Sequence, residues 1–118
     1  MTAIEGMAAA WYRIRFMELL EKLAAEGFTL RTFPAYERHL GVEKYNCAAL
    51  LEPTPEGRWR RFSSPGFLID GHIALLVERQ GRKFFVFKSK QLPAEGEPLR
   101  QFERFLVELE AILSSQSI

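Results

Sequence analysis

The sequence contains one cysteine, Cys47, and two histidines, His39 and His72. A lone cysteine cannot form an internal disulfide, and nothing else indicates an oxidising compartment. A zinc site usually takes three or four close ligands with a short-range pair such as CxxC or HxxxH. No such pair occurs, so we expect no metal site.

Long apolar runs and an excess of one charge are also missing. Runs such as Ile73 to Val77 are far shorter than the roughly 20 residues of a membrane-spanning helix. Sixteen Lys and Arg against fifteen Asp and Glu leave a net charge of +1, which draws the chain toward neither nucleic acid nor anionic lipid. The first residues show no basic stretch followed by an apolar one. We therefore expect a cytoplasmic protein.

The 118 residues, of which 47% are hydrophobic and 26% charged, have the composition of a globular protein. This length fits one domain over residues 1–118 and leaves no room for a second core. We found no internal repeat and no phosphate-binding loop of the GxxxxGK[ST] or GxGxxG type.

A helix is predicted near the N-terminus, ending close to Glu26. One helical face is expected to carry Ala8, Tyr12, Phe16, Leu19, Leu20 and Leu23. Gly27 suits the left-handed position after a helix, and Phe28 is expected to fold back on Leu23.

A second helix is predicted after Pro98, and residues 114–118 behind it are expected to fray. Its apolar stripe consists of Leu99, Phe102, Leu106, Leu109 and Leu113, broadened by Phe105 and Ile112.

Between the helices, short apolar segments separated by turn residues predict about five strands joined by hairpins. The predicted strands are Phe28 to Phe33, Tyr45 to Glu52, Arg58 to Phe62, Phe67 to Ile69 with His72 to Glu78, and Lys83 to Lys90. One or two helical turns are expected over Ala35 to Leu40, and a linker over Leu92 to Pro98. Phenylalanines on both faces of Lys83 to Lys90 predict a central strand covered on both sides.

This order predicts an α+β domain: a helix, an antiparallel meander of short curled strands, and a C-terminal helix packed on the same sheet face as the first. An SH3-like half-barrel flanked by helices is the alternative.

The function that these patterns favour is a non-enzymatic interaction module. Met7, Trp11, Ile14 and Met17 lie off the main stripe of the first helix, so that helix is apolar over more than half its circumference. We therefore expect a homodimer with this helix at the interface. A ligand or partner is expected on the curled sheet, with Trp59, Phe67, His72 and His39 as candidate binding residues.

Three alternatives stay open. The aromatic content suits a carrier of haem or another flat apolar ligand, with His72 or His39 as the axial ligand. The cluster Arg58-Trp59-Arg60-Arg61 combines phosphate-binding cations with a stacking ring, and a nucleic-acid surface would add Arg82 and Lys88.

The third alternative is a degenerate nuclease. An acid at a strand start, then a hairpin and lysines, resembles the metal-binding core of the PD-(D/E)xK nucleases, with Asp70 as the acid and Lys88 or Lys90 as the lysine. That chemistry needs a second carboxylate two residues before the lysine. This sequence has Val86 before Lys88, and Lys88 before Lys90, so the resemblance implies a core without that ligand. We found no other sign of catalysis and expect no enzyme.

Overall fold

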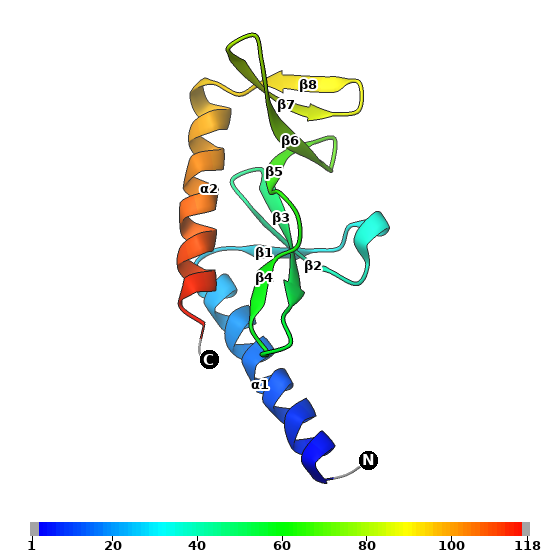
Figure 1. The fold of residues 1–118 in the computed structure, drawn as a ribbon. Coiled ribbons are helices and arrows are strands. Elements are labelled where there is room, and N and C mark those ends of the chain that lie inside the picture. Colours follow the sequence, from blue (N-terminus) through cyan, green and yellow to red (C-terminus); the bar gives the residue numbers. More distant parts are fainter. Residues whose placement is uncertain (1–2, 117–118) are drawn as a thin grey trace.

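The fold is an α+β arrangement in which one curled antiparallel sheet is flanked by two helices (Figure 1). It is described by a computed structural model covering residues 3–116, with side chains from Tyr12 onward. The elements are α1 (Ala3–Ala25), β1 (Thr29–Arg31), a 3-10 turn (Pro34–Tyr36), β2 (Leu40–Lys44), β3 (Cys47–Pro53), β4 (Trp59–Arg61), β5 (Gly66–Ile69), β6 (His72–Arg79), β7 (Arg82–Phe87), β8 (Lys90–Pro93) and α2 (Gly96–Ser114).

The strands follow the order β1-β2-β3-β5-β6-β7-β8, and β4 pairs with the far end of β3. Every pairing is antiparallel and joins elements close in sequence. Strand β3 therefore branches, because Cys47 and Ala48 pair with β5 while Leu51 to Pro53 pair with β4. The predicted class, with a half-barrel curl, is confirmed.

Both helices cover the same face of the sheet, as predicted. Leu19 and Leu23 of α1 share one core with Phe105 and Leu109 of α2. Ring contacts join that core to the sheet, with centroid distances of 5.7 Å for Phe28–Phe105, 5.2 Å for Phe85–Phe102 and 5.2 Å for Phe67–Phe85. The opposite sheet face holds a smaller buried cluster of Phe33, Ala48 and Leu50.

Helix α1 ends as the sequence predicts. Gly27 takes φ +83°, its N–H donates to Ala24, and the N–H of Phe28 donates to Leu23. These two bonds form a Schellman motif, which satisfies carbonyls that the helix end would otherwise leave open. Phe28 is thereby turned into the core.

The predicted number of about five strands was too low, since the described residues form eight. Tyr45 and Asn46 both adopt positive φ, 55° and 61°, and so start a turn where we predicted a strand; the segment before them forms β2. Lys88, with φ 54°, reverses the chain and splits Lys83 to Lys90 into β7 and β8. Asn is enriched at positive φ, whereas Tyr and Lys are not, so Tyr45 and Lys88 give no sign of these reversals in the sequence.

Three finer predictions were also wrong. The helical segment over Ala35 to Leu40 shrinks to the 3-10 turn, because Leu40 joins β2. The linker expected over Leu92 to Pro98 contains the end of β8 and the start of α2. Strand β7 lies between two strands, but Phe84 and Val86 on its second face are only half-buried, since both helices lie on the first.

The molecule is longer than a chain of this size needs to be. Its radius of gyration is 16.2 Å and its extents are 57 × 26 × 22 Å. A compact domain of 118 residues has a radius of gyration of about 13.5 Å. Figure 1 shows the reason: the N-terminal half of α1 projects beyond the β4 end of the sheet.

Candidate interaction site

The middle of α1 is fixed to the turn between β3 and β4. The hydroxyl of Tyr12 donates to the carbonyl of Pro55, and Nη1 of the buried Arg15 donates to the carbonyl of Glu56 at 3.2 Å. Gly57 completes the turn with φ +84°, and a Cβ there would lie 3.0 Å from Cε1 of Tyr12. This turn is thus a docking point for the helix.

A groove opens between this part of α1 and the β3–β4 hairpin. Its volume is about 440 Å³, and we call it the Trp59 groove; it is lined by Tyr12, Arg13, Phe16, Pro53, Thr54 and Trp59. The Phe16 and Trp59 rings lie 5.1 Å apart between centroids. Among the described residues of this lining, Arg13 alone is charged, so they offer apolar walls with one cation.

The backbone of Trp59 is hydrogen-bonded to Gln116, close to the C-terminus. The side-chain amide of Gln116 accepts from the Trp59 N–H and donates to the Trp59 carbonyl. The amide therefore pairs with the edge of β4 that β3 leaves open. The prediction that the tail frays was wrong for Ser115 and Gln116, and residues 117–118 lie outside the described part.

A second apolar surface of α1 faces away from the protein core. Ile14 and Met17 are 49% and 54% exposed, whereas Leu19 and Leu23 on the opposite side of the helix are buried. Tyr12 of the predicted core face is also partly exposed, because the helix has passed the edge of the sheet there. The side chains of Met7, Ala8 and Trp11 lie outside the described part.

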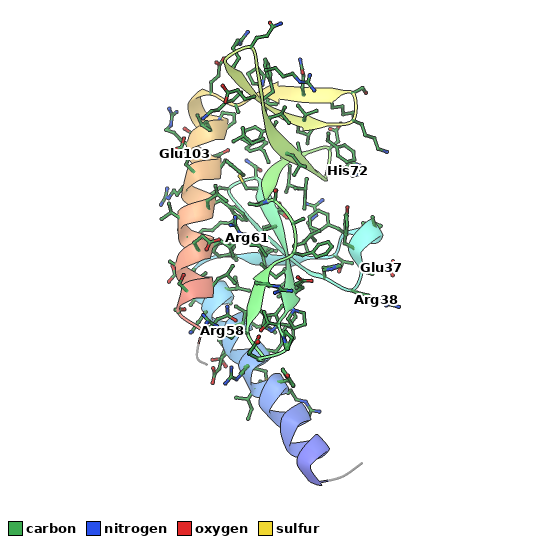
Figure 2. The ribbon with its side chains drawn as sticks, viewed as in Figure 1. Glu37, Arg38, Arg58, Arg61, His72 and Glu103 are labelled. Carbon is green, nitrogen blue, oxygen red and sulfur yellow. The ribbon has the colours of Figure 1, made fainter. Side chains whose placement is uncertain are left out.

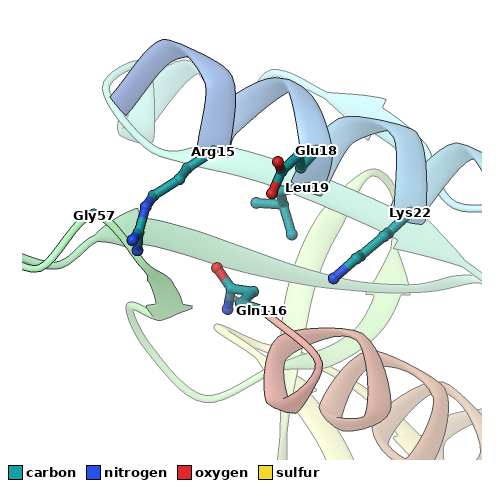
Figure 3. A pocket seen from close by; sticks show the side chains of 6 residues that line it. All are labelled: Arg15, Glu18, Leu19, Lys22, Gly57 and Gln116. Carbon is teal, nitrogen blue, oxygen red and sulfur yellow. The ribbon is translucent and has the colours of Figure 1, made fainter. Parts of the chain in front are cut away.

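A small polar crevice lies on the other flank of α1 (Figure 3). It is lined by Arg15, Glu18, Leu19, Lys22, Gly57 and Gln116, and its volume of about 10 Å³ suits a single water. Lys22 donates to the carbonyl and hydroxyl oxygens of Ser115 at 2.8 and 3.2 Å. The crevice is therefore a junction between α1 and the end of α2.

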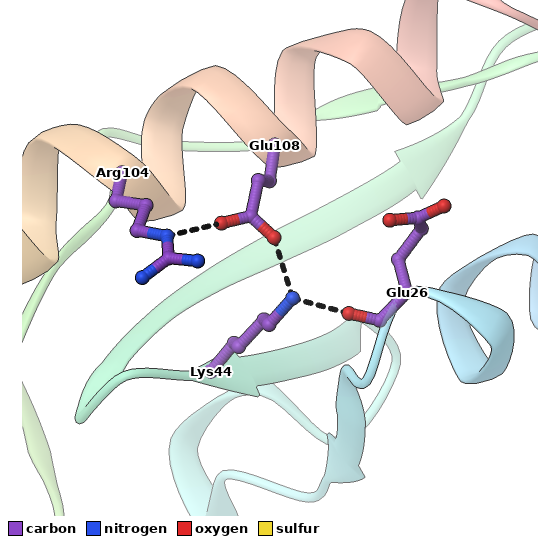
Figure 4. Close-up of polar contacts among 4 residues, drawn as sticks. All are labelled: Glu26, Lys44, Arg104 and Glu108. Carbon is purple, nitrogen blue, oxygen red and sulfur yellow. Dashed lines mark hydrogen bonds and ion pairs between the residues drawn. The ribbon is translucent and has the colours of Figure 1, made fainter.

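Another polar cluster ties both helices to β2 (Figure 4). Lys44 Nζ lies 2.5 Å from Oε1 of Glu108 and donates to the carbonyl of Glu26, while Arg104 Nε lies 3.2 Å from Oε2 of Glu108. Burial raises the pKa of Glu108, but hydrogen bonds from Lys44 and Tyr45 and the nearby cations outweigh it, so the net shift is downward. The bond with Glu108 raises the pKa of Lys44. Since each charge has a partner, we read this cluster as structural.

The four residues predicted to bind a ligand do not meet in one place. Trp59 lines the groove, Phe67 is buried against Phe85, and His72 stacks on Phe87 with centroids 4.3 Å apart. The rings of His39 and Phe62 lie 3.8 Å apart between centroids. His39 also lines a separate hollow of about 330 Å³ formed by residues 34–39. Neither histidine lines the Trp59 groove, so neither can serve there as the predicted axial ligand of haem.

The residues of the predicted nucleic-acid surface are also divided. Trp59, Arg60 and Arg61 form β4, and Arg58 directly precedes it. Arg60 pairs with Glu52 at 2.9 Å and Arg61 with Glu110 at 3.0 Å. Arg82 and Lys88 lie on the β6–β7–β8 hairpins, at the end of the sheet that holds His72 and away from Arg58 (Figure 2). The six residues therefore do not form one continuous cationic surface.

The residues that resemble a nuclease core form an ion pair instead. Lys90 contacts the carboxylate of Asp70 and holds the pKa of that carboxyl below its usual range. Lys88 lies against the Phe87 ring. Among the described residues, no group of three or more His, Cys, Asp and Glu is placed to hold a metal.

Cys47 is buried at the centre of the sheet, and burial raises the pKa of its thiol to about 12. A thiol that stays protonated at neutral pH is a poor nucleophile.

Neither helix, over its described residues, is long and apolar enough to cross a membrane.

Sequence reasoning missed Tyr12, Arg13, Phe16 and Gln116 as parts of this site. Tyr12 and Phe16 follow the spacing of core residues, and Gln116 lies in a polar tail. No local signal marks a contact between Gln116 and a residue 57 positions earlier.

Comparison with known proteins identifies no relative: no family model, no curated protein and no solved structure matches the chain.

Proposed function

We propose that this protein is a non-enzymatic cytoplasmic interaction module that acts as a homodimer joined through the outer face of α1. The observation that carries the proposal is the exposure of Ile14 and Met17 on the side of α1 opposite the buried Leu19 and Leu23. A helix with apolar residues on two opposite sides gains free energy when both are covered, and the sheet covers only one.

The projecting half of α1 supports the same proposal. An isolated helix of this length is marginal in water, and most helices in proteins are stabilised by tertiary packing. A second copy would supply that packing along the whole of α1. It would also bring the two Trp59 grooves into one assembly, since Arg13 and Phe16 of the groove belong to the same helix.

The test is sedimentation of the purified protein over a hundredfold concentration range. We expect a species of twice 13.6 kDa that dissociates on dilution. Ile14→Asp would place a charge in the contact and raise the dimer dissociation constant by more than about tenfold.

Val107→Asp is the matched control, because Val107 is 70% exposed on α2, away from the proposed contact. Both variants add one carboxylate at an exposed apolar position. A wild-type monomer at every concentration, or equal weakening by the two variants, would overturn the proposal.

A second candidate function is the binding of a flat apolar ligand in the Trp59 groove. It is favoured by the volume of about 440 Å³ and by the rings of Tyr12, Phe16 and Trp59 that wall the groove. Because no histidine lines it, the ligand would be held by ring contacts and by the cation of Arg13, without ligation by a histidine.

Titration with 1-anilinonaphthalene-8-sulfonate in a Trp11→Phe background tests this, since Trp59 is then the sole tryptophan. We expect the dye to quench Trp59, with weaker binding in Arg13→Ala. Arg79→Ala, on the β6–β7 hairpin, is the control. Unquenched Trp59, or equal binding by both variants, would exclude the groove.

A further inference from the structure

We propose that the two copies of α1 pair in antiparallel orientation, so that the projecting half of each helix lies along the half of its partner that is anchored to the sheet. This inference rests on the proposed homodimer and names how the second copy fits. It follows from the spacing, size and charge of the residues on the outer face of α1.

The outer face has the spacing of a coiled-coil seam. In the described part, Ile14, Met17, Glu21 and Ala24 recur at steps of three and four, and all are exposed. The sequence continues these steps upstream at Ala3, Met7 and Ala10, inside the same helix. We call these seven positions the outer seam, which spans three heptads over a helix of 23 residues.

Glu21 opposes parallel pairing. In a parallel dimer, each seam residue meets its own copy, so Glu21 would face the partner's Glu21 within the contact. Two carboxylates at that distance repel and lose solvent.

Residue size points the same way. Parallel pairing would place Ala10 on the partner's Ala10 and Ala24 on the partner's Ala24, which leaves layers with little to pack. Antiparallel pairing sets each alanine against a longer side chain: Ala10 against Glu21, and Ala24 against Met7. Ile14 then meets the partner's Met17 on both sides of the two-fold axis. Each of these layers combines a larger residue with a smaller or flexible one, as good packing requires, while Ala3 lies beyond the end of the partner helix.

The anchored side of α1 leaves room for this partner. Arg15, Leu19 and Leu23 turn toward the β3–β4 turn and the core, whereas the exposed Ile14 and Met17 lie on the far side of the helix. Glu21 and Ala24, beside the body of the protein, are exposed, like Ile14. A partner helix can therefore lie along the whole seam without displacing a described contact.

Disulfide trapping tests the orientation while Glu21 stays in place. Met7→Cys carrying a size tag is mixed with untagged Ala24→Cys; Cys47 remains, because its buried thiol stays protonated. Antiparallel pairing puts position 7 opposite the partner's position 24 and separates the two copies of position 7 by about 25 Å. Since a disulfide needs Cα atoms within about 7 Å, we expect the mixed disulfide to exceed either homodisulfide by more than about tenfold.

Met7→Cys mixed with Val107→Cys is the control, because Val107 lies on α2, and no mixed disulfide is expected there. Dominant homodisulfides in a sedimenting dimer would overturn the antiparallel orientation and leave the homodimer standing. A dimer that forms neither kind of disulfide would move the interface elsewhere and overturn both proposals. A monomer in sedimentation would also overturn both.

Discussion

The side-chain amide of Gln116 forms two hydrogen bonds of 2.7 Å with the backbone of Trp59, one to its N–H and one to its carbonyl. The amide acts as a one-residue strand on the open edge of β4. It links the end of α2 to the β3–β4 hairpin, which forms one wall of the Trp59 groove. The backbone of Trp59 is thus bonded to Gln116, while its ring contacts Phe16.

Gln116→Ala is expected to lower the free energy of unfolding by about 1–2 kcal/mol, because both backbone groups of Trp59 lose their partner. Urea denaturation followed by tryptophan fluorescence measures this. Gln91→Ala, at an exposed position on β8, is the control. Equal midpoints for the two variants would show that the amide does not hold β4.

Gly57→Ala is expected to destabilise the protein more than Gly81→Ala. Both glycines have positive φ, 84° and 78°, so each substitution carries a conformational cost of about 1–2 kcal/mol. A Cβ at Gly57 would also press on Tyr12, whereas nothing lies within 4 Å at Gly81. The difference in unfolding free energy between the two variants, measured by chemical denaturation, gives the cost of the contact with Tyr12. Equal losses of unfolding free energy would mean that Tyr12 moves aside without cost.

Phe105→Ala is expected to cost about 3–5 kcal/mol of unfolding free energy, since it would open a cavity where α2 meets Phe28 and the sheet. Val107→Ala, two residues along the same helix but 70% exposed, should change stability by less than about 0.5 kcal/mol. Thermal and urea unfolding provide the values. A small effect of Phe105→Ala would contradict the packing of α2 on this face.

The stability should fall in acid partly through Glu108. The folded state lowers the pKa of this carboxyl below the unfolded value of about 4.3, so its contribution is present above that pH and is lost as the pH falls through the lower folded value. Glu108→Gln should therefore show a shallower loss of stability between about pH 6 and pH 3.

Glu103→Gln, an exposed position on the same helix, should keep the wild-type pH dependence. Unfolding midpoints in urea, measured at several pH values, give the comparison. The same slope in all three proteins would show that the pair of Lys44 and Glu108 contributes nothing to acid sensitivity.

The class of fold and both helices were predictable from the sequence because they depend on local spacing. Gly27 followed by Phe28 predicted the helix end, and the period of apolar residues predicted that α2 would cover the sheet. The spacing did not predict which residues form the centre of the α2 stripe. Phe105, expected at its margin, is fully buried, while Leu99 and Leu106, expected within it, are only partly buried. A broad stripe permits several rotations of the helix, and packing selects one.

Of the residues that line the candidate site, only Trp59 was predicted from the sequence. Its neighbours Tyr12 and Phe16 are separated from it by more than forty positions, and their spacing is equally typical of a core. His39, Phe67 and His72 were grouped with Trp59 because all lie in the strand region, yet the pairing of the strands distributes them along the sheet.

Two helices, the end of α1 and the apolar residues on opposite sides of α1 follow from local patterns, because each depends on side chains within a few turns of one another. Packing selects which of those two sides is buried, where Tyr45, Asn46 and Lys88 reverse the chain, and how Gln116 reaches Trp59. Those outcomes depend on contacts between distant segments, whose free energy exceeds the weak local preferences of the residues involved.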